Sequence, residues 1–304
     1  MPMHAAAFPR PTSILLATDL SARSDRARER AMALAREWQA ELVVLTVLPK
    51  DANFSLPNAF VEPQEFPAGE STPPSPASVV REQAERDFAD LDLPHRIHVA
   101  EGEVGAAAMQ AARETGSGLI VVGCARTDAL RRMQVGSSVE WLSRHATLPV
   151  LVVQERVRAP YRHVAVASDF SQAGEVALHL ADAWFADAQR RTLLHGYEVS
   201  TRTLAASDER REQALAAAQQ QAQAQGAAYL AAALGPRADA WNAEIHPNNP
   251  VRLAREFARA TGVDLTVMAS HGRSGLLDRL IGSVAKRLLE TAYTDVLVVR
   301  TPMP

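Results

Sequence analysis

The chain has one cysteine, Cys124, among its 304 residues. A disulfide within the chain needs two cysteines and a multi-cysteine zinc site needs several, so the sequence excludes both. A single thiol also fits a reducing compartment. Because Cys124 directly follows an apolar segment, we expect a small buried side chain here rather than a redox switch.

Long apolar runs are missing too. No stretch reaches the roughly 18 apolar residues that a membrane-spanning helix needs. Residues 1–10 contain a run of alanines but neither a charged start nor a sustained apolar core, so they do not resemble a secretory signal. We therefore expect a soluble cytoplasmic protein without a membrane partner.

An excess of charge of either sign is also absent. The chain has 32 basic and 35 acidic residues and a net charge of -3, so we expect no nucleic-acid partner, which would need a basic surface. Apolar residues make up 47% of the chain, enough for a core, which excludes disorder over its whole length. Three motifs are absent as well: Gly-x-Ser-x-Gly, the Walker loop and His-Glu-x-x-His.

The sequence does contain an internal repeat. Four segments of the first half return in the second half in the same order, at an offset of 150 or 146 residues. They are ILLATDLS at 14–21 (VAVASDFS at 164–171), LIVVG at 119–123 (LTVMA at 265–269), the Gly-Ser pair at 136–137 (282–283), and LPVLVV at 148–153 (TDVLVV at 294–299). Kept order and spacing predict two copies of one domain.

The first repeat is predicted to span residues 1–155 and the second residues 160–304. The joint between them, near residues 154–161, is polar and contains a proline, as expected of a short linker. Residues 49–76 interrupt the first repeat with a proline-rich segment that lacks apolar periodicity. We expect a long surface loop there, with a lid or docking segment as the alternative.

Each repeat alternates apolar strands with amphipathic helices. Short apolar runs predict strands at 14–17, 42–48, 95–100, 119–123 and 150–153, at the copy of the first strand, and near 192–197, 240–246, 264–269 and 295–299. Apolar spacings of three and four predict helices around 27–38, at 77–90, 105–116 and 137–146, and near 172–186, 207–234, 250–261 and 283–293. The fold class is therefore α/β, with two doubly wound domains, each built on a parallel five-stranded sheet covered on both faces.

Ligands of an open parallel sheet bind at the carboxyl ends of its strands. Two features of each repeat come to this edge. One is the aspartate after the first strand, Asp19 or Asp169. The other is the loop after the fourth strand, which ends in Gly-Ser and opens a helix. The N–H groups and positive dipole end of a helix start attract phosphate, and glycine lets a ligand approach the backbone closely.

The loop of the second repeat contains further candidate donors. Arg273 and Ser274 follow Gly272, and both can donate hydrogen bonds to a phosphate. His271 has no evident acidic partner in the sequence, so we do not expect a catalytic base here. In the first repeat Arg126 stands where the second has Gly272, and it would either fill the phosphate space or offer a cation to it.

These ordered residues resemble the universal stress protein family over nearly all of both repeats. Members that bind nucleotides carry glycine, two residues, glycine, nine residues, then glycine followed by serine or threonine. The second repeat follows this pattern with alanine at the first glycine, and the first repeat follows it with arginine at the second. The matching positions are Ala269, Gly272, Gly282 and Ser283 in the second repeat, and Gly123, Arg126, Gly136 and Ser137 in the first.

The resemblance implies a fold similar to that of the adenine-nucleotide α-hydrolases. It implies a tandem pseudo-dimer in which the last strands, 150–153 and 295–299, meet. It also implies a role in the stress response with an adenine nucleotide, ATP or AMP, as ligand and magnesium carried on the phosphates. Whether two chains pair again as a homodimer is left open.

We place the main nucleotide site in the second repeat, with Asp169 at the nucleoside and the loop and helix start at the phosphates. Its residues are Ala167, Ser168, Asp169, Ala269, Gly272, Arg273, Ser274, Gly282, Ser283 and Val284. The first repeat offers a weaker site. Its residues are Asp19, Gly123, Arg126, Gly136 and Ser137. We expect no catalytic residue and no metal bound directly by side chains.

Two other functions stay open. The fold can serve as a nucleotide-free protein-interaction module, in which the aspartates only accept backbone hydrogen bonds and the Gly-Ser pairs only begin helices. Weak ATP hydrolysis has the least support, because no positioned general base is apparent. We therefore expect a binding protein rather than an enzyme.

Overall fold

The structure is a computed structural model that describes residues 8–50, 75–124, 136–198, 208–271 and 281–300. Most of the proline-rich segment predicted at 49–76 lies outside the described residues. Within them, no helix combines the length and apolar character needed to cross a bilayer.

The described strands form one ten-stranded sheet, in the order β3-β2-β1-β4-β5-β10-β9-β6-β7-β8. The first repeat contributes β1 (Ser13–Ala17), β2 (Glu41–Leu48), β3 (His95–Glu101), β4 (Leu119–Gly123) and β5 (Val150–Val153), and the second contributes β6 (His163–Ala167), β7 (Arg190–Gly196), β8 (Asn242–His246), β9 (Leu265–Ala269) and β10 (Asp295–Val299). Strands are parallel within each repeat, whereas β5 and β10 pair antiparallel, with Leu151 opposite Leu297. The predicted α/β tandem, joined through its last strands, is thereby confirmed.

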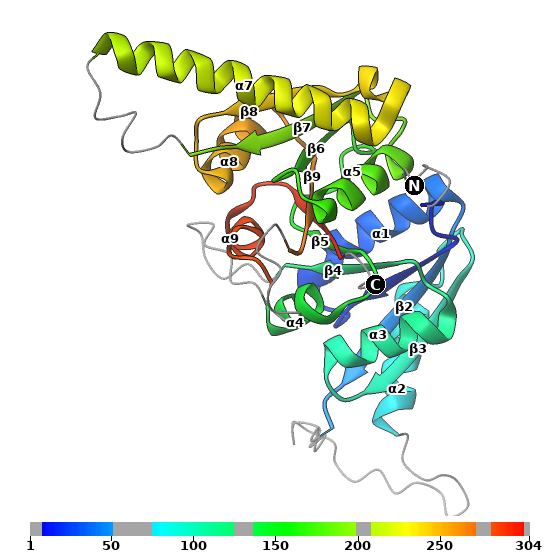
Figure 1. Cartoon of the computed structure of the whole chain (residues 1–304). Helices are drawn as coiled ribbons and strands as arrows, with labels where there is room; N and C mark the ends of the chain where they lie inside the picture. The colour runs from blue at the N-terminus through cyan, green and yellow to red at the C-terminus, as the bar shows by residue number, and fades with distance from the viewer. Residues whose placement is uncertain (1–7, 51–74, 125–135, 199–207, 272–280, 301–304) are drawn as a thin grey trace, which may run out of the picture.

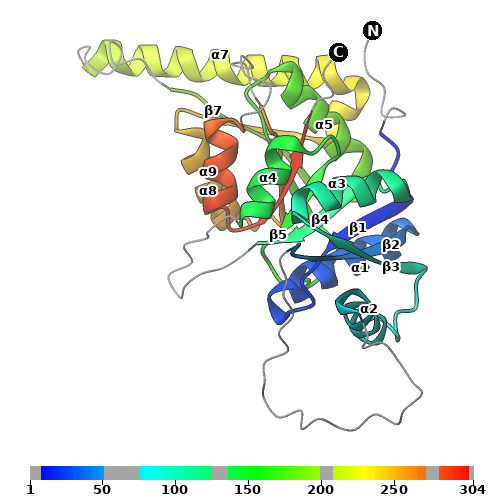
Figure 2. The same cartoon turned by 90° about the horizontal axis from the view of Figure 1, so that it is seen from below.

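Helices cover both faces of the sheet (Figures 1 and 2). One face carries α1 (Asp25–Trp38), α2 (Pro76–Asp87), α5 (Gln172–Trp184) and α7 (Asp208–Leu234), and the other carries α3 (Val104–Thr115), α4 (Ser137–His145), α8 (Pro250–Thr261) and α9 (Ser283–Thr291). Two short 3₁₀ turns, η2 (Ala22–Ser24) and η3 (Gly235–Ala240), precede α1 and β8.

The apolar strands explain the two-faced core. Successive side chains of a strand point to opposite faces, and in β1 the side chains of Ile14 and Leu16 enter one core while that of Leu15 enters the other. All three are fully buried. A strand with both faces covered needs a continuous apolar run rather than an alternating one.

A buried carboxylate joins the two repeats. Asp295, at the start of β10, is inaccessible to solvent. Its Oδ1 accepts hydrogen bonds from the backbone N–H groups of Gln154 at 2.8 Å and Glu155 at 3.0 Å. Its Oδ2 accepts one from the Tyr161 hydroxyl at 2.6 Å and lies 3.2 Å from Nε of Arg30 on α1. One side chain thus holds the linker and a helix of the first repeat.

Aromatic rings close the same boundary on the α1 and α5 face. Trp38 of α1 packs against Trp184 of α5 with ring centroids 5.4 Å apart, and the Arg30 guanidinium lies 3.9 Å from the centre of the Tyr161 ring. Burial raises the pKa of Tyr161 well above its ordinary value, so its hydroxyl stays a hydrogen-bond donor. The two repeats therefore share one continuous core.

Replacing Asp295 by alanine tests this joint. The change leaves Arg30 buried without its carboxylate, so we expect the free energy of unfolding to fall by about 3–5 kcal/mol. The control is Asp92→Ala, which breaks an exposed, solvent-screened ion pair with Arg36 and should therefore lower the free energy of unfolding far less. Urea unfolding followed by circular dichroism measures both, and equal losses in the two variants would contradict this account.

Candidate functional site

The turn after β6 carries the second-repeat aspartate. Asp169 Oδ1 accepts a hydrogen bond from the backbone N–H of Ser171 at 3.0 Å, and the Ser171 hydroxyl in turn caps α5 by accepting from the N–H of Gly174 at 3.2 Å. Asp169 therefore does accept a backbone hydrogen bond, the role that the nucleotide-free alternative assigns to it. It uses one carboxylate oxygen of a half-buried side chain that also lines a cavity.

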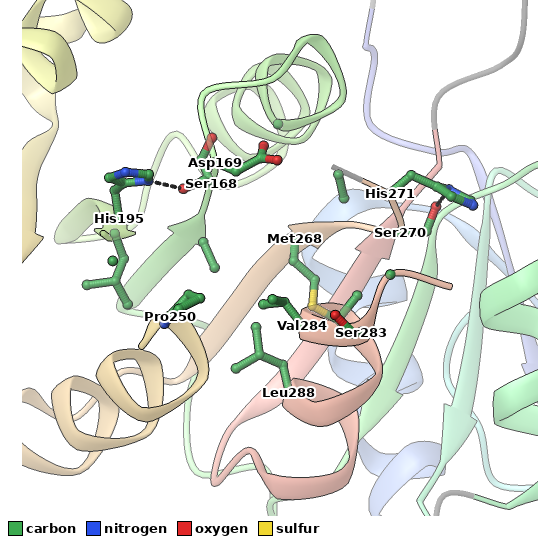
Figure 3. A pocket seen from close by; sticks show the side chains of 17 residues that line it. Ser168, Asp169, His195, Pro250, Met268, Ser270, His271, Ser283, Val284 and Leu288 are labelled. Atoms are coloured by element: carbon green, nitrogen blue, oxygen red, sulfur yellow. Dashed lines mark hydrogen bonds between the residues drawn. The ribbon is translucent and has the colours of Figure 1, made fainter. Parts of the chain in front are cut away.

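A cavity of about 290 Å³ opens at the carboxyl ends of β6 and β9 (Figure 3). Seven of the ten residues predicted for the main site line it. They are Ala167, Ser168, Asp169, Ala269, Gly282, Ser283 and Val284. The other three, Gly272, Arg273 and Ser274, lie outside the described residues. Three segments that are far apart in sequence thus meet around one space.

The start of α9 forms one side of this cavity. Gly282 is the N-terminal cap residue in extended conformation, and its N–H donates to the Ser270 carbonyl at 2.9 Å. No side chain of the described residues caps this helix. The N–H groups of its first turn, at Ser283 and Val284, therefore face the cavity edge with the positive end of the helix dipole.

Ala269 replaces the first glycine of the family pattern, and its backbone is not strained. Among the described residues other than glycine, positive φ angles occur at Leu20, Gln39 and Phe170 only, so Ala269 is outside the left-handed region. A Cβ built on its counterpart Gly123 meets its nearest atoms at 3.7 Å, an ordinary contact. The substitution thus leaves the backbone of this strand end unchanged.

The far end of the cavity is apolar, and sequence reasoning missed it. Leu194, Met268 and Leu288 are nearly fully buried and line it together with Pro250. Gly196 is needed beside them, because a Cβ there would lie 2.6 Å from the Asn248 carbonyl oxygen. The sequence did contain one indication of this apolar end. The strand predicted near 192–197, which follows α5, ends at the same sheet edge as Asp169.

A second cavity, of about 310 Å³, lies at the corresponding place in the first repeat. Asp19 and Gly123 line it, as does the half-buried Cys124. Gly136 and Ser137 begin α4 beside it without being among its lining residues, whereas the next residue, Ser138, is. Arg126 lies outside the described residues.

The two aspartates are held differently. Asp19 Oδ1 accepts three hydrogen bonds: from the Ser21 N–H at 3.0 Å, the Ser21 hydroxyl at 2.7 Å and the Ser24 hydroxyl at 2.6 Å. Burial raises the pKa of Asp19, but these hydrogen bonds outweigh it and leave the pKa below its ordinary value. The counterpart of Ser24 is Gly174, which has no hydroxyl, and a Cβ there would lie 2.5 Å from the Ser168 Oγ.

Fold and site together define a class of protein. A doubly wound parallel sheet with an aspartate after its first strand and a cavity at the carboxyl edge, bordered by a helix start, defines an α/β protein of the open-sheet kind. The sequence pattern of the universal stress protein family matches the chain twice, over residues 12–154 and 160–300. The chain belongs to this family.

Two relatives place the chain among named family members. Universal stress protein Rv2005c of Mycobacterium tuberculosis is 31% identical over 199 residues, which cover 60% of this chain and 61% of that protein. Universal stress protein MJ0531 of Methanocaldococcus jannaschii is 39% identical over 69 residues, which cover 21% of this chain and 41% of that protein. The matches thus span less than two thirds of either relative.

Two solved structures share the fold over nearly all of the chain. The functionally unknown protein PA1789 from Pseudomonas aeruginosa has a TM-score of 0.63 at 18% identity, covering 95% of this chain and 92% of that one. A universal stress protein from Archaeoglobus fulgidus has a TM-score of 0.60 at 15% identity, covering 95% and 98%. A universal stress protein in complex with cAMP matches 48% of this chain and 98% of its own, at 21% identity and a TM-score of 0.33.

Removing one hydroxyl tests how Asp19 is held. In Ser24→Ala we expect the pKa of Asp19 to rise towards the ordinary value of about 4, because the carboxylate loses a donor. Carbon-detected NMR titration of the carboxyl group measures it. The lowered pKa stabilises the fold above the unfolded-state pKa, and this contribution is lost as the pH falls through the folded-state pKa. Wild type and variant should therefore differ in stability at neutral pH and converge in acid.

The control is Ser78→Ala, whose hydroxyl donates to the Ser75 carbonyl on α2. It should leave the pKa of Asp19 unchanged. An Asp19 that titrates identically in wild type and Ser24→Ala would show that the hydroxyl does not hold the carboxylate.

Proposed function

We propose that the protein binds an adenine nucleotide, chiefly in the second repeat, as part of a stress response. The observation that carries the proposal is the convergence of three sequence segments, after β6, after β9 and at the start of α9, on one cavity. That cavity is apolar at one end and bordered at the other by a helix start. A nucleotide has the matching polarity, with an apolar base and anionic phosphates.

Each part of the ligand has a partner in this arrangement. The base would enter the apolar end, between Leu194, Met268 and Leu288. Asp169 would accept hydrogen bonds from the ribose hydroxyls, and the N–H groups at the start of α9 would bind phosphate. The cavity volume of about 290 Å³ is close to that of the smallest small-molecule sites, which measure about 300 Å³. The base and ribose would be enclosed, with the phosphates at the mouth.

The first repeat is the poorer candidate for the same ligand. Its aspartate already accepts three hydrogen bonds on one oxygen from its own turn. An incoming ribose hydroxyl would have to compete with these donors. The Arg23 side chain also lines this cavity, whereas the second repeat has Ala173 at that position. The smaller side chain at position 173 favours the second repeat as the main site.

Magnesium would arrive with the phosphates. Among the described residues, no group of three or more His, Cys, Asp or Glu side chains is arranged to hold a metal ion. Mg²⁺ usually keeps several waters and is bound through substrate phosphates and few carboxylates. The chain's own part would then be to hold the nucleotide at Asp169 and α9 and to keep water from the base.

Two matched glycine variants test the assignment. Gly282 and Gly136 each precede the first residue of a helix, α9 and α4 respectively. A Cβ on Gly282 meets only the Ser270 carbonyl oxygen, at 3.5 Å, so Gly282→Val should fold while its branched side chain blocks the helix start. We expect isothermal titration with ATP–Mg to show at least a tenfold loss of affinity in Gly282→Val and none in Gly136→Val.

Two results would overturn the proposal. One is that the wild type binds no ATP–Mg at about 100 μM ligand; a Kd of that size corresponds to a binding free energy of about 5.5 kcal/mol. The other is loss of binding in Gly136→Val with Gly282→Val intact, which would move the site to the first repeat.

A further inference from the structure

The backbone beside Asp169 adopts a conformation that needs support. Phe170 has a φ of 60°, in the left-handed region, which costs an L-residue roughly 1–2 kcal/mol. Its N–H donates to the Ser168 hydroxyl oxygen at 3.1 Å. The turn of the first repeat has the same shape, with Leu20 at a φ of 59° and its N–H on the Thr18 hydroxyl at 3.0 Å. The two turns differ in what packs against them.

In the second repeat an imidazole holds the turn on both sides of Asp169. The His195 ring stacks on the Phe170 ring with centroids 4.1 Å apart and an angle of 25° between the planes. Its Nδ1 lies 2.8 Å from the carbonyl oxygen of Ser168 (Figure 3). A carbonyl only accepts, so Nδ1 carries the proton and donates. One side chain at the end of β7 thus contacts the residue before Asp169 and the residue after it.

A tyrosine from α7 completes the contact. The Tyr229 ring packs on Phe170 at 5.0 Å, and its hydroxyl lies 3.4 Å from both the Ser171 carbonyl and the Ser168 hydroxyl. Burial raises the pKa of Tyr229 to about 12, so the hydroxyl stays protonated. One turn earlier, α7 has Gly226, where a Cβ would lie 2.0 Å from Ile245 Cδ1. This glycine lets α7 pack closely over β7 and β8 (Figure 1).

The first repeat lacks this arrangement. The strand register pairs Ala17 with Leu45 and Ala167 with Leu194, so Thr46 stands where the second repeat has His195. In the first repeat serine hydroxyls bind the carboxylate itself. In the second repeat aromatic side chains hold the backbone on either side of it. The aromatic side chains thus hold the backbone of the turn that carries Asp169.

We infer that Phe170, His195 and Tyr229 are positioning residues that hold Asp169 in the geometry for binding ribose hydroxyls. This inference rests on the proposed nucleotide-binding function of the cavity. It makes the second-repeat site dependent on α7, which supplies Tyr229. It also supplies a reason why the two repeats, with the same turn, differ as nucleotide sites.

The test compares ATP with 2′,3′-dideoxy-ATP, both with magnesium, by isothermal titration of the full chain. Phe170→Leu installs the residue that the first repeat has at this turn. We expect the affinity for ATP to fall about tenfold, the scale of an aromatic pair, while the affinity for the dideoxy nucleotide changes little. Phe170→Tyr keeps the ring and should behave as wild type. The matched control is Leu20→Ala, in the turn of the first repeat.

A second comparison separates positioning from a general structural effect. In an Asp169→Asn background, Phe170→Leu should lower ATP affinity no further, because its effect acts through Asp169. An equal loss in both backgrounds would overturn the inference. His195→Thr, again the first-repeat residue, provides the same readout should Phe170→Leu not fold.

The outcomes for the two proposals are distinguishable. A wild type that binds no ATP overturns both the nucleotide function and the positioning role. A wild type that binds ATP, with Phe170→Leu and His195→Thr equal to it for both nucleotides, overturns the positioning role and leaves the function standing.

Discussion

The antiparallel pairing of β5 with β10 is the contact on which the arrangement of the whole chain depends. Each strand has four consecutive apolar residues, all of them buried, and as free sheet edges the two strands would invite association with other chains. Paired, they turn two sheets into one. Because strands are parallel within each repeat and antiparallel across this joint, the carboxyl edges of the two repeats lie at opposite ends of the sheet. The two cavities therefore open independently.

Asp295, at the start of β10, ties this strand to the linker and to α1 of the first repeat. A buried carboxylate is costly unless it is well paired. This one has four donors: two linker backbone N–H groups, the Tyr161 hydroxyl at the end of the linker, and the Arg30 side chain of the first repeat. Replacing one partner leaves the others buried and unsatisfied. The two repeats are not equivalent at this position, since the first repeat has Pro149 where the second has Asp295. The tandem chain can specialise each half in a way that a symmetric dimer cannot.

Specialisation is visible at the two aspartates. The same strand, turn and helix are built twice, yet hydroxyls satisfy the carboxylate in the first repeat while rings support the surrounding backbone in the second. The helices between the second and third strands of each repeat differ as well, with twelve residues in α2 and 27 in α7. A shared fold thus carries two cavities with different chemistry, in keeping with the separation of fold from function.

Local periodicity predicted most of the fold, because buried strands and amphipathic helices leave direct marks in sequence. Boundaries moved where polar residues or 3₁₀ turns intervene: β7 begins at Arg190 rather than 192, and β8 begins after the turn that ends at Ala240. Ser21, which precedes the first predicted helix, caps η2 rather than α1. The internal repeat and motif spacing gave the polar side of the main cavity. Three features escaped prediction: the apolar end of the cavity at Pro250 and Leu288, the hydrogen bonds of Asp295, and the stacking of His195 on Phe170. Each depends on tertiary packing between residues that are far apart in the sequence.

The central claim is that one half of this chain binds an adenine nucleotide and the other does not bind it comparably. Native mass spectrometry of the intact chain with ATP–Mg measures it directly, because ligand number and chain number are read from one mass. The account predicts one nucleotide for each chain at concentrations that saturate the site. No bound nucleotide, or two bound with equal affinity, would contradict it.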